Sequence, residues 1–235
     1  MLGQIFNYEN RFWRFMGFLG DLLLLDVLLL LCALPVVTAG VGLCAAYYVC
    51  FKLIEHENTG TLRGFFHSFR QNLRQGVCLT LILLLVGIAL SYDLQFAQQL
   101  LGRLSGMTAY LLTGLCGLIA VLYLMILLYV FPLQARFYNP LTLTLRNALL
   151  LAIRNLPRTA LMFLINAALL CGTGYCFLAA PQAAIVPAMF ALPVGVYFNA
   201  WLLRGVLGLE PGKGDRPVSD EDASEETAGT GAGTE

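Results

Sequence analysis

Long apolar runs separated by short polar stretches dominate the chain. Gly76–Ser91 and Gly106–Gln134 contain no charged residue, and Leu22–Leu34 contains a single aspartate. Runs of this length are typical of transmembrane helices, which need about 20 apolar residues to cross ~30 Å of hydrocarbon. The pattern predicts an all-α fold, a polytopic transmembrane helix bundle with about six spans. The predicted spans are Phe15–Leu34, Val36–Leu53, Gly76–Asp93, Ala109–Leu133, Thr159–Leu178 and Ile185–Leu203.

The second predicted span has two interpretations. It is rich in small residues between Ala39 and Ala46 and ends in Lys52. Small residues allow helices to approach closely, which favours a helix in the interior of the bundle. The alternative is a re-entrant hairpin hinged at Pro35, which does not cross the membrane.

Two amphipathic segments precede the third and fifth predicted spans. Apolar residues recur at helical spacing in Leu62–Leu73 and again in Leu141–Leu156, the latter after Asn139-Pro140, a favourable start for a helix. Each segment ends in an element of arginine, asparagine and leucine that leads into the apolar run. We interpret both as cytoplasmic interfacial amphipathic helices whose arginines bind lipid phosphate or a partner protein. The candidate interfacial residues are Arg63, Arg70, Asn72, Arg74, Arg146, Arg154, Asn155 and Arg158.

These two segments also suggest an internal repeat. Each follows an aromatic-rich helix end, Ala45–Tyr48 in the first case and Tyr129–Pro132 in the second. Two tandem units of span, interfacial helix and span would form a parallel repeat, because both units enter the membrane from the same side. An accidental likeness is the alternative, because the matching element is short.

Composition and charge support a membrane protein and orient it. Hydrophobic residues make up 59% of the chain and charged residues 12%, about half the charged share usual in soluble domains. With six spans, thirteen Lys and Arg residues fall on one side and only Arg103 on the other, which predicts that both termini are cytoplasmic. We expect a membrane-embedded domain over residues 1–207 and an acidic, disordered cytoplasmic tail over 208–235.

Few residues in the predicted spans suggest chemistry. Asp21 and Asp26 lie in the first span, and Asn166 and Asn199 lie in the fifth and sixth. Intramembrane carboxylates are functional candidates because burying them is costly. However, the two aspartates lie about 140° apart around a helix and do not converge. The alternative is structural: Asp21 accepts bonds from arginine or a loop backbone, and the asparagines bridge helices.

No motif indicates catalysis. The chain has no Gly-rich phosphate loop, nucleophile elbow or zinc-protease motif, and His56 and His67 have no evident third ligand. The seven cysteines fall almost entirely in predicted spans and are expected to be apolar fillers. We therefore expect no enzyme, no metal, no cofactor and no nucleic-acid partner, and we expect contact with the lipid bilayer. The sequence does not predict an oligomeric state.

Several short motifs, in order along the chain, resemble one bacterial family. They are Gly20–Asp26, Leu34–Gly40, Ala45–Tyr48, Phe65–Leu73 and Asn155–Arg158. Together they resemble the YesL-like integral membrane proteins, the domain of unknown function 624. The likeness covers about residues 3–207. It departs from the family pattern at Asp26, where the family pattern leads us to expect asparagine.

The resemblance implies a role by analogy. The family has no established activity, but its genes often lie beside carbohydrate uptake systems of the ATP-binding-cassette type. We therefore expect a non-catalytic accessory protein of the bacterial cytoplasmic membrane, with a sugar-transporter permease or ATPase as its partner. The alternative is a small transporter or channel, with Asp26, Asn166 and Asn199 lining a polar path through the bundle.

Overall fold

The computed structural model describes residues 11–55, 60–103, 107–137, 139–180, 182 and 185–208. Over these residues the chain forms helices and no strand, which confirms the all-α prediction. Six of the helices are long and apolar enough to cross a membrane, as the sequence predicts. The helices are α1 (Arg11–Ala33), α2 (Val36–Ile54), α3 (Thr61–Arg103), α4 (Met107–Arg136), α5 (Leu141–Arg154), α6 (Leu156–Ala179) and α7 (Ile185–Leu207).

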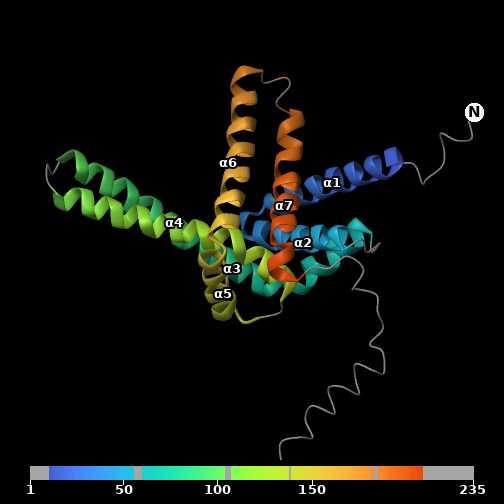
Figure 1. The fold of residues 1–235 in the computed structure, drawn as a ribbon, viewed down its shortest axis with the longest axis horizontal. Coiled ribbons are helices and arrows are strands. Elements are labelled where there is room, and N and C mark those ends of the chain that lie inside the picture. The colour runs from blue at the N-terminus through green and yellow to red at the C-terminus, as the bar shows by residue number, and fades with distance from the viewer. Residues whose placement is uncertain are drawn as a thin grey trace, which may run out of the picture.

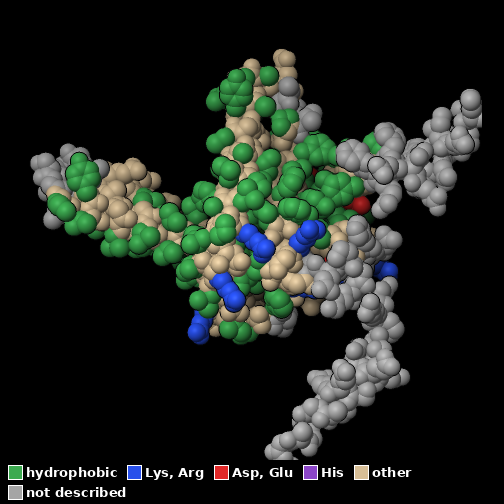
Figure 2. Space-filling model, in the orientation of Figure 1, with side chains coloured by type: hydrophobic (Ala, Val, Ile, Leu, Met, Phe, Trp, Pro, Cys, Tyr) green, Lys and Arg blue, Asp and Glu red, His purple; other side chains and the backbone are tan. Residues whose placement is uncertain are grey.

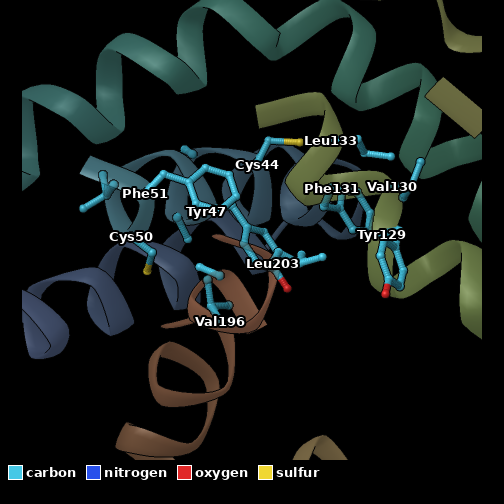
Figure 3. Packing of buried hydrophobic residues seen from close by; sticks show 14 of the residues in the cluster. Cys44, Tyr47, Cys50, Phe51, Tyr129, Val130, Phe131, Leu133, Val196 and Leu203 are labelled. Atoms are coloured by element: carbon cyan, nitrogen blue, oxygen red, sulfur yellow. The ribbon is translucent and has the colours of Figure 1, made fainter. Parts of the chain in front are cut away.

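Helix α2 lies at the centre of the fold. It packs against α1, α3, α4 and α7, and most of its residues are buried. Figure 3 shows side chains of α2, α4 and α7 meeting in one core, among them Tyr47, Phe131 and Leu203. The small residues of α2 make this packing possible, since Gly40 lies directly against side chains of α3 and α4. The chain breaks at Pro35, between α1 and α2, as both interpretations expect, and the burial of α2 favours an interior helix.

Two helical hairpins project from this core in different directions (Figure 1). One consists of α3 and α4, and the other of α6 and α7. Large apolar side chains cover their outer parts: Tyr92 is 69% exposed, Tyr175 72% and Leu178 86%. Apolar surface of this extent on a monomer fits contact with lipid rather than with water. The predicted contact with the bilayer is therefore compatible with the fold.

The first amphipathic segment is not a separate helix, which corrects the sequence prediction. Helix α3 runs for 43 residues without a break and joins the predicted interfacial helix to the third span. At the second copy the chain does break: α5 ends and Asn155 has φ −118° and ψ 44°. Pro157 follows two residues later. It has no N–H to donate to the carbonyl of Ile153, and its ring would clash with that carbonyl if the helix ran on unbroken. Arg74 stands at the corresponding position of α3, so nothing interrupts that helix.

Helix α5 is a separate amphipathic helix, as predicted. One stripe of it, Thr144, Ala148 and Ala152, is buried, while its arginines are exposed. Its position at a membrane interface and the parallel repeat stay predictions. The predicted tail over 208–235 lies outside the described residues, apart from Gly208.

Candidate functional site

Three polar side chains meet within the helix bundle. Asn166 of α6 donates its Nδ2 to Oδ1 of Asn199 on α7 at 3.0 Å, and Nδ2 of Asn199 donates to Oδ1 of Asn166 at 3.3 Å. Asn199 Nδ2 also lies 3.4 Å from the hydroxyl oxygen of Tyr47 on α2. Asn166 Nδ2 additionally donates to the carbonyl of Met162 at 2.7 Å. We call Tyr47, Asn166 and Asn199 the polar cluster; it links α2, α6 and α7.

The polar cluster borders a cavity of about 510 Å³. The cavity lies between α2, α4, α6 and α7, and apolar side chains such as Leu128, Phe131 and Val196 form most of its wall. The Tyr47 hydroxyl accepts a hydrogen bond from Asn199, and no acceptor for its own proton lies among the described residues. The cluster can therefore orient one polar group of a ligand, but it contains no nucleophile paired with a base.

Sequence reasoning selected Asn166 and Asn199 and missed Tyr47. Amides stand out in an apolar run, whereas tyrosine is common near the ends of membrane helices. Tyr47 and Asn199 are also 152 positions apart, so no local pattern connects them.

The two aspartates have different surroundings. Asp26 is 0% exposed, and neither of its carboxylate oxygens has a hydrogen-bond partner among the described residues. It is not among the residues that line the cavity, so the structure does not bring it together with the polar cluster. Asp21 accepts a hydrogen bond of 2.6 Å from Oγ1 of Thr61, the first residue of α3. A carboxylate at a helix N-terminus is favourable, which supports the structural interpretation of Asp21.

The candidate interfacial residues divide into surface arginines and structural asparagines. Both asparagines, Asn72 and Asn155, donate Nδ2 to the carbonyl oxygen four residues earlier, at 3.1 Å in each case. Asn72 is buried and Asn155 half-buried. All the candidate arginines are exposed: Arg63, Arg70, Arg74, Arg146, Arg154 and Arg158. The arginines are therefore the members of the set that can contact a lipid or a partner.

A polar contact near the end of α2 escaped the sequence analysis. Arg136, the last residue of α4, donates Nη1 to Oε1 of Glu55 at 3.0 Å, and Glu55 is 6% exposed. Two residues earlier, Gln134 Nε2 lies 3.4 Å from Oδ1 of Asn72. The first contact joins the ends of α2 and α4, and the second joins α4 to the first third of α3. Glu55 and Arg136 are 81 positions apart, so their pairing follows only from the tertiary fold.

The described residues show no group of three or more His, Cys, Asp or Glu side chains that could hold a metal ion. All seven cysteines of the chain are described, and all are free thiols. His67 is exposed on α3, whereas His56 lies outside the described residues. These histidines and cysteines therefore give no indication of where a cofactor would bind.

Comparison with known proteins gives one match. Residues 21–94 match the model of a family described as "Protein of unknown function, DUF624". The matched segment contains both aspartates, all of α2 and the arginines at the start of α3. It supports the resemblance found in the sequence over this part of the chain. Searches of curated proteins and of solved structures found no match.

Proposed function

We propose that the chain is a YesL-like, non-catalytic accessory protein of the bacterial cytoplasmic membrane. Its partner is the permease or the ATPase of an ATP-binding-cassette transporter for carbohydrate. The observation that carries this proposal is the set of exposed arginines on α3, α5 and the start of α6. Exposed guanidinium groups can bind carboxylates of a partner, and arginine is enriched in protein interfaces.

The distribution of charge supports the proposed orientation. In Figure 2 most of the blue Lys and Arg side chains gather around α5 and the adjoining ends of α6 and α7, and the coloured outer parts of the two hairpins show none on this face. Positive charge concentrates on the cytoplasmic side of membrane proteins. This distribution supports the proposal that this end of the bundle and both termini are cytoplasmic.

Gentle affinity purification from native membranes tests the accessory role. A variant with Arg63, Arg70 and Arg74 changed to glutamine should insert normally and lose the transporter subunit, because these arginines are exposed and removing them spares the core. Arg103→Gln is the matched control, since it removes the one cation assigned to the opposite side. The proposal fails if the triple variant retains the partner, or if the wild-type protein recovers no transporter subunit.

A second candidate function, transport of a small solute, is supported by the cavity of about 510 Å³ beside the polar cluster. Here the purified protein in liposomes should conduct a solute or ion. Asn199→Leu should change the flux because it removes a polar group from the cavity wall, and Asp26→Asn should change it if the buried carboxyl takes part. No flux across a broad panel of solutes would remove the support for this function.

A further inference from the structure

Two hollows share Tyr48 as a common wall where α2 approaches the start of α3. The first has a volume of about 260 Å³ and is lined by Tyr48, Arg63, Gly64 and His67. The second has a volume of about 170 Å³ and is lined by Tyr48, Phe51, Lys52, Glu55, Ala135 and Arg136. One water molecule occupies about 30 Å³ in the liquid. Each hollow is therefore large enough for a polyatomic group, and we call the pair the Tyr48 cleft.

Positive charge dominates the walls of the Tyr48 cleft. Among the described residues that line them are three cationic side chains, Lys52, Arg63 and Arg136, and one carboxylate, Glu55. Arg136 binds that carboxylate at 3.0 Å. Arg63 is exposed and has no ion-pair partner among the described residues. The described residues that line the first hollow include one cation, Arg63, and no carboxylate.

The aromatic wall holds hydrogen-bond donors in place. The ring centroids of Tyr48 and His67 lie 6.3 Å apart, and Nζ of Lys52 lies 5.8 Å from the Tyr48 centroid. α3 lies beside Tyr48 at Gly64: a Cβ there would be in ordinary van der Waals contact with Cε1 of Tyr48, at 3.8 Å. Arg63 and His67 therefore border the same hollow, one turn apart on α3.

We propose that the Tyr48 cleft binds a phosphoryl group. The guanidinium of Arg63 can donate two parallel hydrogen bonds to phosphate oxygens, and His67 and the Tyr48 hydroxyl can donate further bonds. A phosphate monoester carries about −1.5 to −2 charge at pH 7 and is attracted to the guanidinium of Arg63. The same chemistry suits a soluble phosphate or a phospholipid headgroup. The inference needs no transporter partner and is independent of the accessory role.

Titration of the purified full-length protein in phosphate-free micelles tests the site with two probes. Inorganic phosphate is followed by the broadening of its phosphorus resonance, and dioctanoyl phosphatidylglycerol by native mass spectrometry, both at fixed ionic strength. Arg63→Gln should weaken binding by about tenfold or more, because it removes charge-assisted hydrogen bonds. His67→Gln should weaken it less. Arg146→Gln, an exposed arginine that lines neither hollow, is the matched control and should leave binding unchanged.

The two probes distinguish the source of the group. Binding of inorganic phosphate that depends on Arg63 supports a soluble ligand, and binding of the lipid alone, with the same dependence, supports a headgroup site. The proposal is overturned if neither probe binds, or if Arg146→Gln weakens binding as much as Arg63→Gln does. In the latter case the probes respond to surface charge in general. Circular dichroism of each variant confirms that these exposed substitutions leave the helices intact.

Discussion

Gly40 marks the closest approach of α2 to its neighbours, and enlarging it should destabilise the bundle. A Cβ built on Gly40 would overlap Oγ1 of Thr80 on α3 and lie 2.7 Å from Cε1 of Phe131 on α4. Thr80 is 8% exposed and does not line the cavity, so it has little room to move, whereas Phe131 borders the cavity and can shift partly into it. The Thr80 hydroxyl is also occupied, because it donates to the carbonyl of Gly76 at 2.6 Å.

The expected magnitude follows from three contributions. Forcing an extra methyl group into a packed core costs about 1–3 kcal/mol. Displacing the Thr80 hydroxyl from its acceptor costs about 1 kcal/mol more. Alanine is a better helix former than glycine by about 1 kcal/mol, which offsets part of the loss. We therefore expect Gly40→Ala to lower the free energy of unfolding by about 1–3 kcal/mol.

Unfolding by SDS in mixed micelles, followed by circular dichroism, measures this effect. Gly114→Ala on α4 is the matched control, since a Cβ there meets nothing within 4 Å and should leave stability unchanged or slightly raised. Thr80→Ala combined with Gly40→Ala should recover part of the loss, because it removes the overlapping oxygen. The reasoning is refuted if Gly40→Ala is as stable as the parent, or if Gly114→Ala is equally damaging.

Three further substitutions test other contacts by the same unfolding assay. Asn199→Leu should lower the free energy of unfolding by about 1 kcal/mol. A double-mutant cycle with Tyr47→Phe should give a coupling energy of about 0.5 kcal/mol between the two side chains, and additive effects would contradict their hydrogen bond. Asp26→Leu should raise stability by about 1–3 kcal/mol because it removes a buried, unpartnered carboxyl; a loss would show that the carboxyl has a stabilising partner. Arg136→Gln should lower the free energy of unfolding by only about 1 kcal/mol, since the arginine is 34% exposed while Glu55 is buried. If the stability difference between the variant and the parent is the same at high salt, the loss does not come from the ion pair.

The spans were predictable because each is a long apolar run that can be recognised in the sequence. The second span is predicted as Val36–Leu53 and observed as Val36–Ile54. The third is longer than predicted at both ends and reaches Arg103. Asp93 does not end it, because one exposed charge leaves the backbone hydrogen bonds intact and the residues that follow are mostly good helix formers. Local composition therefore locates a span well and its ends less well.

The two copies of the arginine-asparagine-leucine element show why local similarity does not guarantee similar structure. In both, the asparagine side chain bonds the carbonyl four residues earlier. Only the second copy has a proline, Pro157, and only there does the helix end. The side chains shared by the two copies are thus compatible with a continuous helix, and Pro157, which the first copy lacks, ends the helix in the second. One proline carries more information about the turn than the repeated residues do.

The geometry of the polar cluster bears on the choice between the two functional hypotheses. Each amide of Asn166 and Asn199 already donates and accepts within the cluster, so a solute that binds there must replace those bonds. Only the proton of Tyr47 lacks an acceptor among the described residues. Asp26, the costliest polar group to bury, does not line the same cavity. A polar path that includes Asp26 would need this fully buried carboxyl to open to the cavity, which requires its surroundings to rearrange. The exposed arginines need no such rearrangement to bind a partner, and this difference supports the accessory role over transport.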